Sequence, residues 1–185
     1  QIAFESAAWG SSEVPVLQIM DELVGSAHAF SAGNSGRAHD AVKANGFLDG
    51  IDAINSNFTD SGLFGIKVQG AGSHSQDLFQ VAMSTLDGLR QPVDEVELAR
   101  AKNALKMNFL LSMEGGADRL EEVARNYASH GSLTIWKHLD AIESVTSAQV
   151  NDAARRILAG KPTMVVTGGA INLVPSMTDV QRQLQ

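Results

Sequence analysis

The chain has 185 residues, 44% of them hydrophobic, which suits one globular domain with a sizeable core. Its 21 acidic residues outnumber the 14 basic ones, and the formal charge of −7 argues against a nucleic-acid partner, because such binding rests on clustered Lys and Arg. The absence of cysteine excludes disulfides, a thiolate zinc site and a cysteine nucleophile. No apolar run approaches the roughly 18 residues of a membrane span, so we expect any membrane association to come through partners.

The chain opens with a predicted strand followed by a predicted helix. Gln1 to Ala8 is apolar and only partly alternating, which is typical of an interior strand. Ser11 and Ser12 offer N-caps for a helix that has Pro15 in its first turn and runs to about Val24. Its expected core face, at helical spacing, is Val16, Met20, Leu23 and Val24.

Small residues fill most of the next stretch, from Gly25 to Gly36, with Phe30 as its one large apolar side chain. We interpret this stretch as a loop, because Gly and Ser permit close backbone approach and disfavour regular structure. A short helix is expected from about Arg37 to Ala44.

A β-hairpin is predicted between Ile51 and Gly70. In its second strand Phe64, Ile66 and Val68 alternate with smaller or polar residues, the pattern of a strand with one buried face. The turn, Thr59-Asp60-Ser61-Gly62, combines side chains that bond their own backbone with a glycine. The first strand, Ile51 to Phe58, alternates poorly, which indicates cover on both faces.

Helical periodicity dominates the second half of the chain. One helix is predicted from Ser73 to Arg90, and a second begins at Asp94, where Glu97 three residues later predicts a capping box. Gly115-Gly116 interrupts this helix, and the periodic pattern resumes and ends at Gly131. The positions of the resumed pattern are Leu120, Val123, Ala124, Tyr127 and Ala128.

A shorter helix carries Ile135, Leu139 and Ile142, and a last one follows a capping box formed by Thr146 and Gln149. Thr163 to Thr167 is the final predicted strand. This order of elements predicts an α+β fold, in which helices pack on one face of a mainly antiparallel sheet.

The residues themselves give little sign of catalysis. None of the five histidines has a His or Glu partner at the spacing of a zinc-binding helix, so we expect no metal site in this chain. The loop from Gly33 to Arg37 lacks the spacing of a phosphate-binding motif. It is interpreted either as a recognition loop or as a plain connector.

Five segments of the chain carry a family resemblance. They are Ala53-Ile54-Asn55 with Phe58 and Asp60 to Gly65, Glu97 to Lys106 with Met113-Glu114, Ile142 to Val150, Pro162-Thr163 with Gly168, and Phe30 to Gly33 with Gly36 and Arg37. Together they resemble the pitrilysin-like metallopeptidases, in the mitochondrial branch of processing-peptidase subunits and ubiquinol–cytochrome c reductase core proteins. The family's zinc motif, H-x-x-E-H, has no counterpart here.

The resemblance implies a pitrilysin-like (processing-peptidase-like) fold for residues 1–185, as the C-terminal lobe of a two-lobe subunit. The first strand and the N-terminal lobe are then expected upstream, in keeping with a processed chain or a fragment. The last of the five segments is similar to a glycine-rich loop that binds presequences. The substrate-binding residues that this implies are Phe30, Ser31, Ala32, Gly33, Gly36 and Arg37.

The function implied first is that of a non-catalytic core subunit of ubiquinol–cytochrome c reductase, on the matrix side of the inner mitochondrial membrane. The partners would be a homologous core or beta subunit, the N-terminal lobe and the cytochrome b and c subunits. The first alternative is a processing-peptidase alpha subunit that holds basic presequences for a zinc-bearing beta subunit. The second is the C-terminal half of an active zinc peptidase. Any zinc is expected in a partner or an upstream lobe, with no cofactor in this chain.

Overall fold

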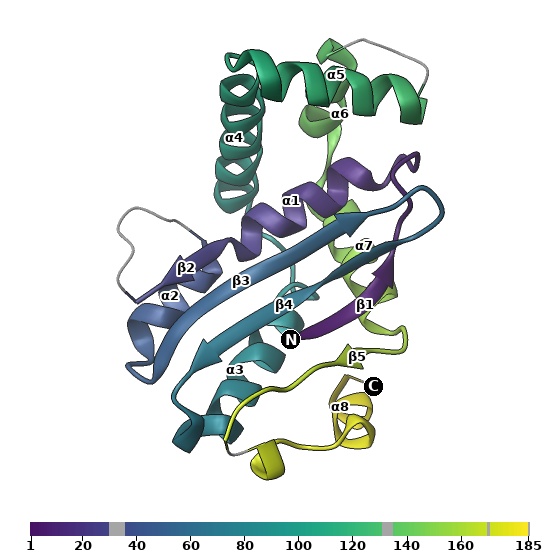
Figure 1. Cartoon of the computed structure of the whole chain (residues 1–185). Coiled ribbons are helices and arrows are strands. Elements are labelled where there is room, and N and C mark those ends of the chain that lie inside the picture. The colour runs from purple at the N-terminus through teal and green to yellow at the C-terminus, as the bar shows by residue number, and fades with distance from the viewer. Residues whose placement is uncertain (30–35, 131–134, 170, 185) are drawn as a thin grey trace.

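A five-stranded sheet forms one layer of the molecule (Figure 1). The computed structural model describes residues 1–29, 36–130, 135–169 and 171–184. The strands lie in the order β2-β3-β4-β1-β5, and every neighbouring pair is antiparallel. The strands are β1 (Ile2–Ser6), β2 (Ser26–His28), β3 (Leu48–Asn57), β4 (Gly62–Gly70) and β5 (Thr163–Met164).

Helices form the second layer, and Figure 1 shows α1, α3 and α7 behind the sheet. The opposite face of the sheet carries no helix in the described part of the chain. The helices are α1 (Val14–Val24), α2 (Arg37–Ala44), α3 (Ser75–Gly88), α4 (Glu95–Ser112), α5 (Gly116–His130), α6 (Ile135–Ser144), α7 (Ser147–Leu158) and α8 (Met177–Leu184), with short 3-10 turns η1 (Gly72–His74) and η2 (Ile171–Leu173). The predicted α+β fold with helices on one face is confirmed.

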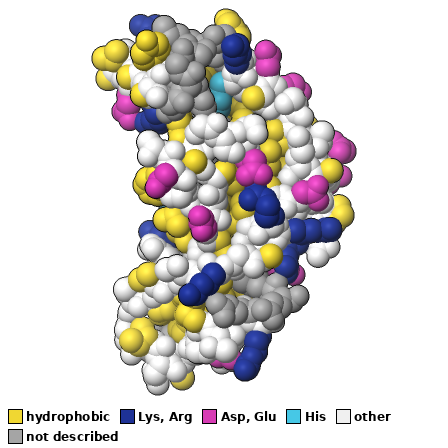
Figure 2. Space-filling view, turned by 90° about the vertical axis from the view of Figure 1, so that its right-hand side faces the viewer, with side chains coloured by type: hydrophobic (Ala, Val, Ile, Leu, Met, Phe, Trp, Pro, Cys, Tyr) yellow, Lys and Arg dark blue, Asp and Glu magenta, His cyan; other side chains and the backbone are white. Residues whose placement is uncertain are grey.

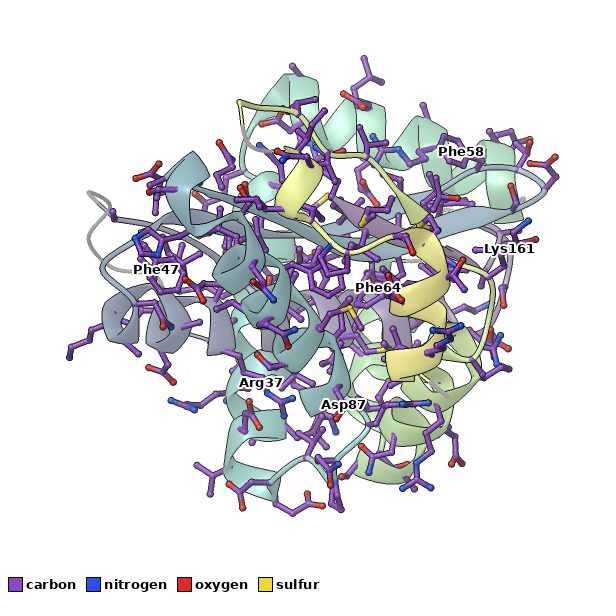
Figure 3. The ribbon with its side chains drawn as sticks, turned by 90° about the horizontal axis from the view of Figure 1, so that it is seen from below. Arg37, Phe47, Phe58, Phe64, Asp87 and Lys161 are labelled. Atoms are coloured by element: carbon purple, nitrogen blue, oxygen red, sulfur yellow. The ribbon has the colours of Figure 1, made fainter. Side chains whose placement is uncertain are left out.

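The core lies between the sheet and α1. Phe4 pairs with Phe64 and Ile2 with Ile66, and all four side chains are buried on the face that the helices cover. Figure 3 shows Phe64 in the interior and Phe58 far out at the hairpin end. The predicted face of α1 is also buried, as are Leu17 and Ile19, because α4, α6 and α7 cover the side of α1 that faces away from the sheet.

Two expectations about the first helix and the following loop are wrong. The N-cap of α1 is Glu13, which makes no side-chain cap bond, while the hydroxyl of Ser11 accepts a hydrogen bond from the Glu13 amide at 3.2 Å. Ser26–His28, expected as loop, is the edge strand β2 and pairs with β3. Three residues are too few to show alternation, so only pairing with β3 reveals this strand.

The two predicted capping boxes differ in outcome. Thr146 and Gln149 form the complete box at the start of α7. Asp94 accepts hydrogen bonds from the amides of Val96 and Glu97, but the Glu97 carboxylate binds Arg37 instead of the Asp94 amide. Arg37, a charged partner from α2, therefore takes the Glu97 side chain away from the local cap.

The final predicted strand is also shorter than expected, since β5 ends at Met164.

Gly65 of β4 lies opposite Ala3 of β1. A Cβ placed there would collide with the backbone of Ile2 and Ala3. We expect Gly65→Ala to lower the free energy of unfolding by about 1–3 kcal/mol, measured by urea denaturation. Gly46→Ala is the control, because a Cβ at Gly46 meets nothing within 4 Å. Equal stability of the two variants would contradict the close packing of the strands.

Asp21, near the end of α1, gives the molecule a pH dependence. Burial, together with the neighbouring Glu22, raises the pKa of Asp21 to about 6. Folding therefore favours the protonated carboxyl, and this group's contribution to stability falls as pH rises from about 4 to about 6. We expect Asp21→Asn to stabilise the protein by an amount on the order of 2 kcal/mol larger at pH 7 than at pH 4. A pH-independent effect in urea unfolding would refute this.

Candidate functional site

Only two residues of the predicted recognition loop lie within the described part of the chain. Phe30, Ser31, Ala32 and Gly33 fall outside the described residues, so their proposed role stays a prediction. Gly36 and Arg37 are described, and they form the start of α2.

Gly36 and Arg37 both make contacts that hold elements together. Gly36 has φ 126°, and a Cβ there would press on the carbonyl oxygens at the end of α1, such as that of Val24 at 3.2 Å. The Arg37 guanidinium donates to both Glu97 carboxylate oxygens, at 2.8 and 3.0 Å, and to the Gly88 carbonyl at 2.7 Å. Figure 3 shows Arg37 near Asp87, the neighbour of Gly88. Arg37 thus joins α2 to the end of α3 and the start of α4.

Two of the histidines pair with carboxylates. His28 Nε2 lies 3.1 Å from Asp52, and His74 Nδ1 lies 2.9 Å from Asp77. In the described ranges no three His, Asp or Glu residues converge in a way that could hold a metal ion. The expectation that this chain carries no cofactor stays a prediction.

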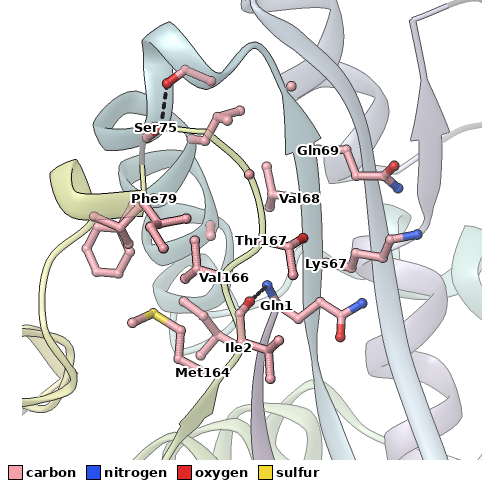
Figure 4. Close-up of a pocket in the computed structure, with 18 of the residues that line it drawn as sticks. Gln1, Ile2, Lys67, Val68, Gln69, Ser75, Phe79, Met164, Val166 and Thr167 are labelled. Carbon is pink, nitrogen blue, oxygen red and sulfur yellow. Dashed lines mark hydrogen bonds between the residues drawn. The ribbon is translucent and has the colours of Figure 1, made fainter.

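A cavity of about 550 Å³ lies beside the far end of β4 (Figure 4). β1 pairs with β4 only as far as Ile66, whereas β4 continues to Gly70, and residues 165–169 run along the other side of the cavity. Leu78, Phe79 and Ala82 of α3 are apolar lining residues, and Lys67 and Asp49 are the charged ones. Extended backbone beside an apolar floor suits an extended polypeptide segment. The sequence indicated β4 but not the cavity beside its end.

The second candidate is a surface, which we call the arm: residues 102–141, from α4 through α5 into α6, without 131–134. In Figure 1, α4 rises away from the sheet and α5 lies across its end. Within its described residues, no side chain between Ala101 and Ile142 is buried. Six large apolar side chains on the arm are exposed: Met107, Leu110, Leu111, Leu120, Tyr127 and Trp136. Figure 2 shows hydrophobic side chains gathered at this upper end of the molecule.

Polar contacts attach the arm to the rest of the domain. The Lys102 ammonium donates to the Glu143 carbonyl and Lys106 donates to the Glu143 carboxylate, both at 2.7 Å. The Asn108 amide donates to Glu22 at 3.1 Å, and the Arg125 guanidinium lies 5.5 Å from the ring centre of Trp9. The inner side of the arm is mixed, since Leu105 packs against the core and the Phe109 ring lies 4.8 Å from that of His138. Large apolar side chains nevertheless remain on its outer side.

None of the described helices is both long and apolar enough to cross a membrane.

The sequence predicted the periodic apolar pattern at Leu120 and Tyr127, but not that these side chains are exposed. Periodicity identifies an apolar face without saying whether anything covers it.

The Arg37–Glu97 pair should stabilise the junction of α2, α3 and α4. Both side chains are about three-quarters buried and the pair is bidentate, so a double-mutant cycle with Arg37→Met and Glu97→Gln should give a coupling energy of about 1 kcal/mol. The exposed Asp179–Arg182 pair of α8, at 3.7 Å, is the control and should give almost none. Additive effects of Arg37→Met and Glu97→Gln in urea unfolding would refute the role.

Known proteins resemble this chain along most of its length. The mitochondrial-processing peptidase subunit alpha of Neurospora crassa is 27% identical over 194 residues, covering 98% of this chain and 34% of that protein. The probable mitochondrial-processing peptidase subunit beta of Arabidopsis thaliana is 27% identical over 186 residues, with 98% and 35% covered. The cytochrome b-c1 complex subunit 2 of Homo sapiens is 29% identical over 169 residues, with 89% and 37% covered. The chain thus spans about a third of the length of these curated relatives.

A solved structure and a family model agree on the fold. A chain of "Complex III2 from Candida albicans, Inz-5 bound" superposes with a TM-score of 0.87 over 99% of this chain and 45% of that one, at 14% identity, which shows a shared fold. The family model described as the Peptidase M16 inactive domain matches residues 1–105, more than half of the chain. This chain therefore belongs to the M16 peptidase family, as a non-catalytic domain of the inactive type.

Proposed function

We propose that this chain is the C-terminal lobe of a two-lobe, non-catalytic core subunit of mitochondrial ubiquinol–cytochrome c reductase, on the matrix side of the inner membrane. The observation that carries the proposal is similarity to the human cytochrome b-c1 complex subunit 2, at 29% identity over 89% of the chain, together with the inactive type of the domain. A core subunit supplies surfaces for assembly rather than reacting groups.

The surface of the domain supports a role in assembly. The arm exposes apolar side chains on three helices, and apolar patches of this kind mark interaction sites in proteins. One whole face of the sheet also carries no helix in the described part of the chain. In the complex, the partners would be a homologous core subunit and the cytochrome b and c subunits.

A second candidate is the alpha subunit of the mitochondrial processing peptidase. It is favoured by 27% identity over 98% of the chain to the Neurospora crassa alpha subunit. In this case Phe30 to Arg37 would hold basic presequences for a zinc-bearing beta subunit. The contacts of Arg37 leave recognition to the rest of that segment, because its guanidinium already binds Glu97 and Gly88.

Affinity purification of the tagged full-length protein from detergent-solubilised membranes tests the two candidates. A core subunit should co-purify with cytochrome b and c polypeptides, identified by mass spectrometry, and with their haem absorbance. An unrelated tagged matrix protein is the control. A haem-free preparation with one zinc-containing partner that cleaves presequences would favour the second candidate and refute the first.

A further inference from the structure

The turn between α2 and β3 contains the dipeptide Asn45-Gly46, and Asn45 is the one asparagine of this sequence that a glycine follows. An asparagine side chain loses its amide when the next backbone nitrogen attacks the side-chain carbonyl carbon. Glycine at that next position favours the attack, because it has no Cβ to obstruct the approach and its backbone rotates freely. The sequence therefore marks Asn45 as the asparagine most open to this reaction.

Gly46 presents its nitrogen to water. It is exposed, and its N–H donates a hydrogen bond to no group in the described part of the chain. A Cβ at Gly46 would meet nothing within 4 Å, so the turn has open space around it. The next residue is fixed instead, since the Phe47 carbonyl accepts from the Ala71 amide at 3.2 Å and the Phe47 ring stacks on His74. The attacking nitrogen is therefore free in a turn that is anchored on its far side.

Asn45 itself caps the end of α2. Its side-chain Nδ2 donates to the Ala41 carbonyl at 2.8 Å, and its backbone amide donates to the Val42 carbonyl at 3.4 Å. These bonds satisfy carbonyls that the last turn of a helix leaves without partners. The Asn45 carbonyl in turn accepts from the amide of Leu48, the first residue of β3, at 3.0 Å. A change at Asn45 thus affects both the end of α2 and the start of β3.

The folded backbone holds the reacting atoms apart most of the time. At the observed ψ of 97° the Gly46 nitrogen points away from the Asn45 side chain, and the bond to Ala41 holds the side-chain amide against the helix. Ring closure needs that bond to break and the Asn45 Cα–C bond to rotate. Because the last turns of helices open far more often than their centres, the reaction follows opening of the end of α2.

We propose that Asn45 is a site of spontaneous deamidation, and that this modification removes the cap of α2. The Gly46 nitrogen forms a bond to Cγ of Asn45 while the Cγ–Nδ2 bond breaks, and ammonia leaves with the proton of the Gly46 N–H. Water then opens the five-membered imide at either carbonyl, which yields aspartate or isoaspartate. Water is the only other reactant, and nothing is oxidised or reduced.

The product cannot do what Asn45 does. An ionised carboxylate has no N–H to donate to Ala41, and it places a negative charge at the negative end of the α2 dipole. Isoaspartate also adds a carbon to the main chain, which disturbs the hydrogen bond from Leu48. The start of α2 stays attached through Arg37 and Glu97. Deamidation therefore loosens one end of α2, slowly and without an enzyme.

Timed incubation of the purified full-length protein in mildly alkaline buffer, followed by digestion and mass spectrometry, tests the site. Asn103 is the internal control, because it is exposed and an alanine follows it. We expect the mass increase of an amide-to-acid conversion to accumulate severalfold faster at Asn45 than at Asn103. Gly46→Ala should slow the conversion at Asn45 severalfold, and the open space around Gly46 lets that variant fold.

Hydrogen exchange of residues 41–48 tests the loss of the cap. Asn45→Asp should make the amides at the end of α2 exchange severalfold faster, whereas Asn103→Asp, which makes the same change of charge in α4, should not. Equal conversion at Asn45 and Asn103, or no effect of Gly46→Ala, would overturn the modification site. Unchanged exchange in Asn45→Asp would overturn the loss of the cap. Neither result depends on whether the chain is a core subunit.

Discussion

The close antiparallel pairing of β1 and β4 above α1 is the constraint on which the rest of the structure depends. Gly65 has no side chain, so the two backbones come together with Phe4 opposite Phe64 and Ile2 opposite Ile66. These buried side chains form one continuous apolar face, which α1 covers. Since α1 is buried nearly all round, it also forms the floor on which α4, α6 and α7 pack.

The junction at Arg37 is the second point where distant segments depend on one another. One guanidinium joins the start of α2, the end of α3 and the first turn of α4. Arg37 is also the last residue of the segment that is similar to a glycine-rich recognition loop. In this chain Arg37 is therefore a residue that positions the end of that segment, and a bidentate partner such as Glu97 suits an Arg better than a Lys.

The domain is well packed between the sheet and α1, and it is open at two other places, the arm and the cavity beside β4. At the arm, exposed polar contacts join α4 to Glu143, and large apolar side chains such as Leu120 and Tyr127 are exposed. Beside β4, a cavity lies between extended backbone and α3. Both features fit a domain that is one part of a larger assembly. An inactive domain of a peptidase family can keep its fold while its surfaces serve assembly.

The sequence by itself determined the elements whose signals are local. The alternation of Phe64, Ile66 and Val68 gave the strand β4, the turn at Thr59 to Gly62 gave the hairpin, and Thr146 with Gln149 gave the start of α7. Such signals depend on neighbours a few residues away, so they can be read along the chain. The family resemblance added the identity of the fold and the segment from Phe30 to Arg37.

Only the tertiary structure decided which partners the side chains have. It turned Glu97 from a predicted cap into the partner of Arg37 and paired Ser26–His28 with β3. Among the described residues it left Leu120 and Tyr127 exposed. A repeat of 3.6 residues states that a helix has an apolar face, but burial depends on what other segments bring to that face. Contacts between residues far apart in sequence, such as Arg37 and Glu97, have no local signal at all.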